Sequence, residues 1–191
     1  MSYNIRGGGF SVKRKRVSSF IQQHKIDVCF IQETKTECFS DSLAREFWGS
    51  KEVDWSAGNS IGASGGMVIL WGKGAVSVNF SFRGKGFVGI NIEWKGKIYN
   101  LINVYAPCNR KDRGLVWLEL LALKNRRGPE DWCIVGDFNE VLNGEERLDV
   151  SSNRDRLGME EFAGFVENMD LVDVNCVGGG DSLGLKTMGR P

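Results

Sequence analysis

Two segments of the sequence place polar side chains directly after apolar runs. An apolar run over 132–135 leads through a glycine to Asp137 and Asn139, and a second run over 28–31 leads to Glu33. Four consecutive apolar residues are typical of a buried strand, and glycine lets the backbone turn where such a strand ends. Asp137 and Asn139 would point the same way along an extended segment, because side chains alternate in a strand. An ordinary Asx-type turn is the alternative.

Two further segments also end in functional groups. Asn4 lies in an alternating stretch that stops at three glycines, and Tyr105 ends an apolar stretch that Pro107 terminates. If the strand ends converge in a sheet-on-sheet core, carboxylates and amides gather without His or Cys. Such oxygen-rich groups suit Mg²⁺, which often binds through one or two carboxylates plus a phosphate. A second carboxylate beside an amide could orient a water for attack on phosphorus, so the residue types fit metal-assisted phosphoester hydrolysis.

The elements that would position these groups follow from apolar spacing. Helical spacing is found after Ser11, after Asp41, from about 112 to 124 and around 159–169. Period-two segments over 67–71, 75–82, 87–94 and 97–105 predict an antiparallel meander, and 171–174 predicts a further strand. The residues from 178 to 191 have no helix or strand period, so we expect a loose tail.

Length and charge restrict the class of protein. The 191 residues suffice for one domain with a core, and 25 basic against 24 acidic residues leave a net charge of +1. The chain therefore has no overall electrostatic field that would attract nucleic acid or a membrane, and any phosphate binding must come from a local group of basic residues. No apolar stretch reaches the roughly 20 residues of a membrane span, and the N-terminus lacks a signal-peptide layout. We expect an intracellular protein without a membrane partner.

Two ligand-binding patterns are excluded. The five cysteines are scattered without CxxC spacing and predict neither a disulfide framework nor a zinc site. A GxGxxG pattern over 84–89 precedes a predicted strand rather than a helix, so it predicts no dinucleotide, and we expect no small-molecule cofactor. The basic run Lys13–Arg16 is interpreted as the solvated first turn of a helix, with a localisation signal or a phosphate contact as alternatives. His24, the only histidine, is expected to be a cap or surface group.

Four motifs in order carry a family resemblance: Tyr-Asn-Ile-Arg-Gly, Ile-Gln-Glu-Thr-Lys, Asn-Val-Tyr-Ala-Pro and Gly-Asp-Phe-Asn. Together they resemble the endonuclease/exonuclease/phosphatase superfamily. The sequence is most similar to the endonuclease domain at the start of plant LINE-type non-LTR retrotransposon polyproteins. Ser64-Gly65-Gly66 before a strand and Glu146-Arg147 after the last motif support that likeness, which covers roughly residues 2–177.

The resemblance implies a fold and a domain organisation. We expect a four-layer α/β sandwich of two mixed β-sheets flanked by helices, which is the DNase I-like fold, incomplete at the C-terminus. The domain would span 1–177 and a disordered tail 178–191.

The resemblance also implies a site. Glu33 would be the Mg²⁺ ligand, with Mn²⁺ as an alternative ion, and Asn4 would neighbour it. Tyr105 would contact the scissile phosphate and Asp137 would orient or deprotonate the attacking water. Asn139 would hold the phosphate or Asp137. The substrate and partner would be DNA, nicked to leave a 3′-hydroxyl, and the protein would be a monomer that is nuclear if it functions in a retroelement.

Departures from the family pattern limit the expected activity. Arg6 stands where apurinic-site nucleases carry Asp, whereas the retroelement relatives resemble this sequence at that position. The family's later Thr-Trp, Ser-Arg-Leu-Asp and Ser-Asp-His segments are missing, so the catalytic His and its Asp partner are absent and we expect impaired activity. Two alternatives stay open. One is an inactive remnant that binds nucleic acid weakly through Lys13–Arg16 and Lys124–Arg127; the other is a phosphomonoesterase of the same superfamily.

Overall fold

The computed structural model describes residues 1–7, 11–58, 65–142, 153–174 and 183–187. Its elements, in chain order, are β1 (Ser2–Asn4), α1 (Ser11–His24), β2 (Val28–Gln32), α2 (Asp41–Trp48), β3 (Val53–Gly58), β4 (Met67–Gly72), β5 (Ser77–Gly84), β6 (Phe87–Trp94), β7 (Lys97–Tyr105), α3 (Arg110–Arg127), β8 (Asp131–Asp137), α4 (Asn153–Asn168), β9 (Leu171–Asp173) and β10 (Leu183–Thr187). No helix in the described part of the chain is long and apolar enough to cross a membrane.

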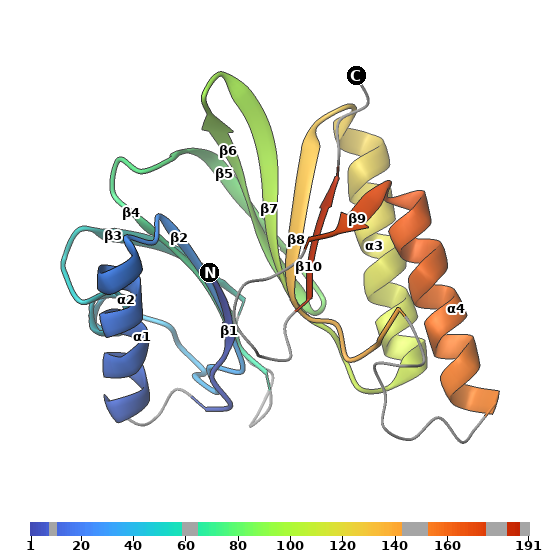
Figure 1. Cartoon of the computed structure of the whole chain (residues 1–191), viewed down its shortest axis with the longest axis horizontal. Helices are drawn as coiled ribbons and strands as arrows, with labels where there is room; N and C mark the ends of the chain where they lie inside the picture. The colour runs from blue at the N-terminus through green and yellow to red at the C-terminus, as the bar shows by residue number, and fades with distance from the viewer. Residues whose placement is uncertain (8–10, 59–64, 143–152, 175–182, 188–191) are drawn as a thin grey trace.

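The strands form two mixed sheets with helices on the outside. One sheet has the order β1-β2-β4-β3 and the other β5-β6-β7-β8-β10-β9. Strand β1 runs parallel to β2, and β7 runs parallel to β8, whereas the other pairs are antiparallel. Helices α1 and α2 lie against the smaller sheet, and α3 and α4 lie against the larger one (Figure 1). The predicted four-layer DNase I-like sandwich is therefore confirmed.

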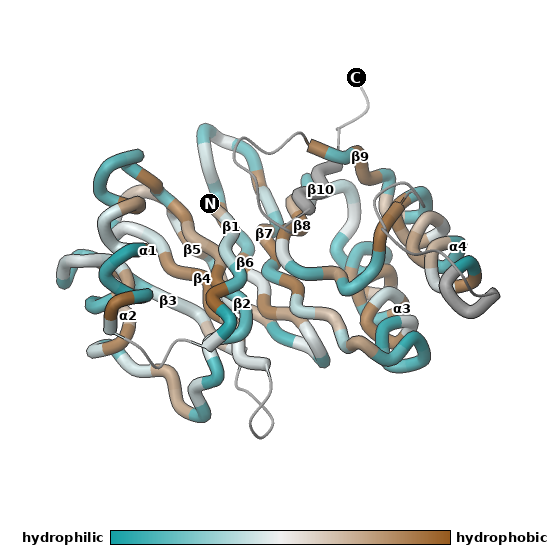
Figure 2. The backbone as a smooth tube through the Cα atoms, turned by 60° about the horizontal axis from the view of Figure 1, so that its bottom comes forward, coloured by the Kyte–Doolittle hydropathy of each residue, from teal (hydrophilic) through white to brown (hydrophobic). Residues whose placement is uncertain are grey.

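Three apolar clusters lie between these layers. Figure 2 shows the hydrophobic residues along the strands of both sheets. The first cluster joins α1 and α2 to the smaller sheet, the second lies between the sheets, and the third joins the larger sheet to α3 and α4. In the third, the ring centroids of Trp117 and Phe165 are 4.7 Å apart, and Phe162 lies 5.3 Å from Trp117. Burial of such large rings stabilises the packing of α3 and α4 on the larger sheet.

The predicted meander is wrong at its first strand. Strand β4 pairs with β2 and β3 in the smaller sheet, whereas β5, β6 and β7 form a meander in the larger one. Residues Met67–Trp71 are buried without alternation, because β4 is covered on one face by helices and on the other by the second sheet. A segment of four residues, 73–76, carries the chain from one sheet to the other.

The structure also differs from the expected loose tail. The backbone of Leu183–Thr187 forms β10, antiparallel to β8 and β9. Leucines alternate with Gly and Lys over this stretch, which is a short period-two pattern between glycine-rich segments. Residues 178–182 and 188–191 lie outside the described part, and the division at residue 177 stays a prediction.

Candidate active site

Strand pairing brings four of the predicted site residues to one end of the sandwich. In the smaller sheet Asn4 is opposite Gln32, the residue before Glu33. In the larger sheet Tyr105 is directly opposite Asp137. Strands β1 and β2 are parallel, as are β7 and β8, so the C-terminal ends of the two strands in each pair lie at the same edge of the sheet. Asn4, Glu33, Tyr105 and Asp137 form a group that we call the strand-end cluster.

Asn4 links the two carboxylates of this cluster. Its Nδ2 donates to Glu33 Oε1 at 2.9 Å and to Asp137 Oδ2, also at 2.9 Å. Its Oδ1 accepts a hydrogen bond from the backbone N–H of Arg6 at 3.0 Å, which fixes the orientation of the amide. Glu33 and Asp137 come from different sheets, so one side chain sets the spacing of both carboxylates. Amide hydrogen bonds to charged groups contribute about 1.5–3 kcal/mol each.

Tyr105 supplies a phenol that stays protonated. Burial, the negative charges of Glu33 and Asp137, and a hydrogen bond with Glu33 together raise the pKa of Tyr105 to about 12. Each of these effects disfavours the phenolate. At neutral pH the Tyr105 hydroxyl is therefore a hydrogen-bond donor beside two carboxylates.

Asn139 is oriented differently from the sequence-based prediction. Strand β8 ends at Asp137, and Asn139 has a φ of 49°, so the strand alternation does not extend to it. Its backbone N–H donates to Asp137 Oδ1 at 3.0 Å, which is the Asx-type turn considered as the alternative. Its Nδ2 donates to the carbonyl of Ala106 at 2.6 Å. Asn139 thus holds the segment after β7 and one oxygen of Asp137.

Glycines allow the backbone to approach the cluster closely. Gly136 has a φ of 138°, and a Cβ there would collide with the carbonyl oxygen of Val104. Gly65 and Gly66 accept backbone hydrogen bonds from Lys35 and Thr34, so their loop lies beside the segment that carries Glu33. A Cβ on Gly65 would lie 3.8 Å from the Tyr105 ring. Ser64 and Glu146-Arg147, which supported the resemblance, lie outside the described residues.

The donor set of the cluster fits Mg²⁺. Its potential ligands are the carboxylate oxygens of Glu33 and Asp137 and the amide oxygen of Asn4, without thiolate or imidazole. Mg²⁺ prefers oxygen ligands and commonly uses one or two carboxylates while keeping several waters. In the described part of the chain, no three His, Cys, Asp or Glu residues gather as a metal cage. The prediction that Glu33 and Asn4 hold the ion therefore remains a prediction.

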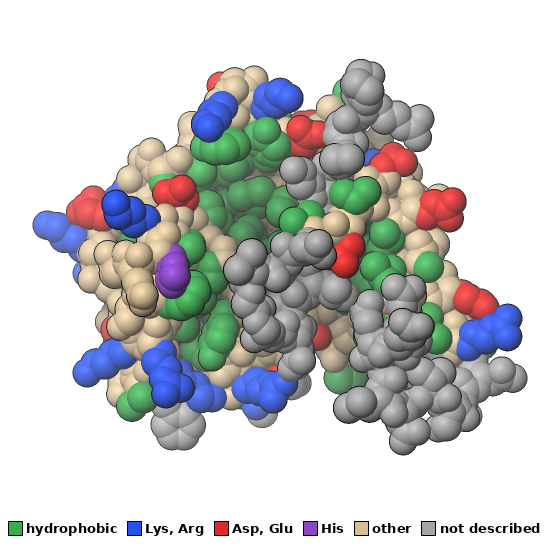
Figure 3. Space-filling view, viewed as in Figure 1, with side chains coloured by type: hydrophobic (Ala, Val, Ile, Leu, Met, Phe, Trp, Pro, Cys, Tyr) green, Lys and Arg blue, Asp and Glu red, His purple; other side chains and the backbone are tan. Residues whose placement is uncertain are grey.

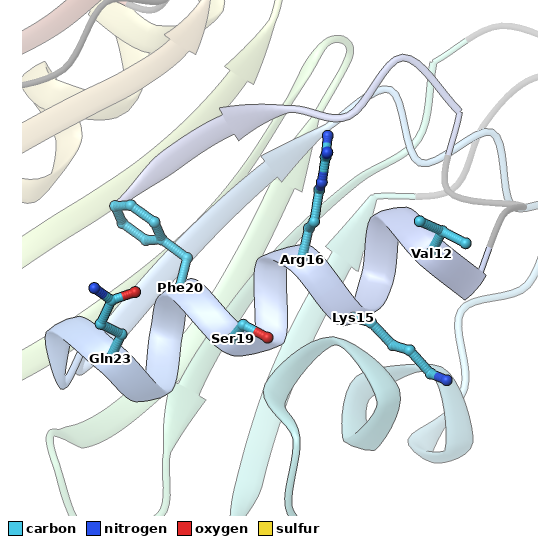
Figure 4. Close-up of a pocket in the computed structure, with 6 residues that line it drawn as sticks. All are labelled: Val12, Lys15, Arg16, Ser19, Phe20 and Gln23. Atoms are coloured by element: carbon cyan, nitrogen blue, oxygen red, sulfur yellow. The ribbon is translucent and has the colours of Figure 1, made fainter.

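The basic residues of α1 surround a shallow pocket away from the cluster. Lys and Arg side chains gather over α1 (Figure 3). Lys13 Nζ donates to the carbonyls of Ile5 and Arg6, and Arg14 pairs with Glu46 at 2.7 Å. The pocket holds about 350 Å³ and is lined by Val12, Lys15, Arg16, Ser19, Phe20 and Gln23. Figure 4 shows Lys15 and Arg16 extending in different directions, so they do not converge on one ligand.

The second basic segment has structural contacts. Lys124 pairs with Asp170 at 2.9 Å, and the Arg127 guanidinium lies 4.6 Å and 4.1 Å from the ring centres of Phe80 and Phe82. Burial lowers the pKa of Arg127, opposed by the charge of Glu130. These side chains pack the C-terminal end of α3, which weakens the interpretation of this segment as a nucleic-acid contact.

Sequence reasoning missed a buried polar link between the sheets. Gln32 Nε2 donates to Asn103 Oδ1 at 2.6 Å, and Asn103 Nδ2 donates to the carbonyls of Ile31 and Val68. The sequence signal that could have revealed this link is Asn103 within the apolar run Leu101–Tyr105, because a buried amide needs hydrogen-bond partners. This link holds the strands that carry Glu33 and Tyr105 at a fixed separation.

The facing mixed sheets, the outer helices and the polar strand-end cluster define a hydrolase of DNase I-like fold. The model of the Endonuclease/Exonuclease/phosphatase family matches residues 1–186, and the chain belongs to this family. Enzymes of this family generally depend on divalent metal ions. No curated protein matches the sequence.

Solved structures with the same fold act on different substrates. AP endonuclease LMAP from Leishmania major is 11% identical with a TM-score of 0.73, over 97% of this chain and 78% of that one. The endonuclease domain of TRAS1, a telomere-specific non-LTR retrotransposon, is 14% identical with a TM-score of 0.66, over 97% and 83%. A mannosyl-6-phosphatase of Bacteroides thetaiotaomicron is 14% identical with a TM-score of 0.66, over 97% and 84%. At these identities the likeness shows the fold alone.

Proposed function

We propose that the chain is a Mg²⁺-dependent phosphodiester hydrolase, the DNA-nicking endonuclease-type domain of a LINE-type retroelement of the plant type. One observation carries the proposal: Asn4 holds the carboxylates of Glu33 and Asp137 on a single amide nitrogen, beside the neutral phenol of Tyr105. A pair of carboxylates beside a neutral hydrogen-bond donor can bind a metal ion and a phosphate and can orient or deprotonate a water molecule. As part of the proposal, the domain spans 1–177 and acts as a nuclear monomer.

Each residue has a chemical task in this proposal. Glu33 and Asn4 would hold Mg²⁺, which supplies positive charge to the phosphate when bound. Asp137 has Oδ1 and Oδ2 each engaged by one donor, so lone pairs remain on both oxygens to accept a proton from the attacking water. Tyr105 donates its hydroxyl proton in a hydrogen bond to a phosphate oxygen. Asn139 keeps the carboxylate of Asp137 in one orientation.

DNA is favoured as the substrate by two observations. The motifs in order resemble those of retroelement endonucleases, and one structure of the same fold is the endonuclease domain of a non-LTR retrotransposon.

The test is nicking of supercoiled plasmid in buffer with MgCl₂, MnCl₂ or EDTA. We expect conversion to the open circle with either metal, none with EDTA, and a 3′-hydroxyl that a DNA polymerase extends directly. Glu33→Ala should abolish nicking, whereas Glu37→Ala is the matched control, since Glu37 is exposed on the same loop. Nicking that survives Glu33→Ala would contradict the site assignment.

An inactive remnant that binds nucleic acid weakly is the second candidate. The observation that favours it is the position of His24, the only histidine, whose ring packs 4.2 Å from Phe20 at the end of α1. None of the described contacts that join Asn4, Glu33, Tyr105 and Asp137 involves His24. A missing general acid or base typically costs a factor of about 10² to 10⁴ in rate. Salt-sensitive DNA binding without nicking would favour this candidate.

A phosphomonoesterase is the third candidate, favoured by the fold likeness to a sugar-phosphate phosphatase. It would release inorganic phosphate from p-nitrophenyl phosphate and leave plasmid intact. The two substrates, assayed side by side with the Glu33→Ala variant, distinguish the candidates.

A further inference from the structure

A buried ion pair lies behind the strand-end cluster, outside all four motifs. Arg113 of α3 and Glu140, three residues after Asp137, have exposed fractions of 7% and 5%. Arg113 Nη2 donates to Glu140 Oε2 at 2.5 Å. The other terminal nitrogen of the guanidinium, Nη1, donates to the carbonyls of Pro107 and Cys108 at 3.4 Å and 2.8 Å. One side chain therefore binds both the segment after β7 and the segment after β8.

Helix α4 closes over this ion pair. A Cβ on Gly158 would collide with Glu140 Oε2 and would lie 3.2 Å from Arg113 Nη2. A glycine within a helix lowers stability by about 1 kcal/mol relative to alanine. The close approach of α4 to the ion pair explains why Gly158 is nevertheless present there. Both side chains are buried, and removal of either charge is strongly unfavourable because the remaining charge is poorly solvated inside the protein.

Short backbone links connect the ion pair to the reactive groups. The N–H of Ala106 donates to the carbonyl of Asp137 at 2.8 Å, and Asn139 Nδ2 donates to the carbonyl of Ala106. Arg113 binds the next two carbonyls after Ala106 and, through Glu140, the residue after Asn139. The two segments are thus joined at successive residues beyond the ends of β7 and β8.

We propose that Arg113 and Glu140 are positioning residues that fix the spacing between Tyr105 and Asp137 for the reaction. The inference rests on the proposed function for the identity of the reacting groups. Arg113 reaches three acceptors with a planar fork, and a lysine has no fork with which to reproduce that geometry. A displacement of about 1 Å at reacting groups costs about 10²-fold in rate, so loss of the pair should lower kcat rather than raise KM.

The test separates positioning from folding with a double variant. Arg113→Met with Glu140→Leu removes both charges, and replacing both members of a buried pair by apolar residues is often neutral for stability. Arg113→Lys is the conservative variant. The matched control is Arg110→Met with Glu161→Leu, which removes an exposed ion pair between α3 and α4, with Nη2 and Oε1 2.7 Å apart.

Nicking kinetics and amide hydrogen exchange are measured under conditions where the variants and the unmodified chain have the same free energy of unfolding, as checked by urea unfolding. We expect the double variant to lose about 10- to 100-fold in kcat for nicking, with KM changed less than about threefold, and Arg113→Lys to recover part of the loss. Amide hydrogen exchange of peptides covering 104–108 and 137–141 should become about tenfold faster, while that of β6 stays unchanged. The control should match the unmodified chain in both.

The outcomes are distinct. Unchanged exchange in both peptides, or a loss expressed only in KM, would overturn the positioning role. Absence of nicking by the unmodified chain would instead count against the proposed function, and the exchange result would still decide whether the pair holds the two segments.

Discussion

Neutralising Glu33 should stabilise the metal-free protein and remove its response to Mg²⁺. Glu33 Oε1 and Asp137 Oδ2 each lie 2.9 Å from the same nitrogen of Asn4, so the two charges are about 6 Å apart or less. At about 6 Å, two unit charges repel by about 3 kcal/mol at an effective dielectric constant of 20 and by about 0.7 kcal/mol in bulk water. Both side chains are partly exposed, so solvent screening leaves about 1 kcal/mol.

Glu33→Gln removes this repulsion and keeps an oxygen that accepts from Asn4. In a chain of this size, about 1 kcal/mol corresponds to a rise in Tm of about 2–4 °C. Mg²⁺ at ten times its Kd should stabilise the unmodified chain by about 1.4 kcal/mol, and this gain should be absent in Glu33→Gln. Thermal unfolding with EDTA and with millimolar MgCl₂ measures both effects.

Glu37→Gln is the matched control, since it removes an exposed carboxylate from the same loop without touching the cluster. It should leave both the metal-free Tm and the Mg²⁺ response unchanged. A fall in the metal-free Tm of Glu33→Gln, or an equal Mg²⁺ response in all three proteins, would refute the reasoning. The first result would mean that the hydrogen bonds of Glu33 outweigh its repulsion from Asp137.

Three further substitutions test the cluster. Asn4→Ala should lower the nicking rate by about 10²-fold, because two charge-assisted hydrogen bonds of about 1.5–3 kcal/mol each are lost, whereas Asn79→Ala on β5 should not change the rate. Tyr105 has a folded pKa raised to about 12, so its stability contribution is complete below its ordinary pKa of 10.0 and is lost as pH rises towards 12. Urea unfolding of Tyr105→Phe should therefore show a shallower loss of stability above pH 10, and an unchanged slope would contradict the assignment. Gly136→Ala should destabilise the chain by at least about 2 kcal/mol, because φ is strongly positive and a Cβ meets Val104; an unaltered urea midpoint would contradict the backbone geometry.

The fold was largely predictable because its signals are local. Uninterrupted apolar runs marked β2 and β8, alternation marked β6 and β7, and helical spacing marked α3 and α4. The transfer of the chain from one sheet to the other after β4 was not predictable in this way. Period-two alternation gives a strand but does not say which neighbour it pairs with, since sheet order depends on contacts far apart in sequence.

The candidate site was only partly predictable for the same reason. The types of Asn4, Glu33, Tyr105 and Asp137 and their places at strand ends were visible in the sequence. The direction of Asn139 was not, because the strand ends at Asp137 and the backbone then turns with positive φ. Alternation applies only while a segment stays extended.

The sequence by itself determined which segments are apolar enough to be buried, where these segments end, and which oxygen-bearing side chains follow them. Only the tertiary structure decided that Asn4 bridges Glu33 and Asp137, since Asn4 and Asp137 are separated by 133 positions. It alone also brought Arg113 to Glu140 behind the same strand ends. The physical reason is that hydrogen bonds of about 3 Å require placement that sequence periodicity does not carry, and packing of two sheets against each other supplies it.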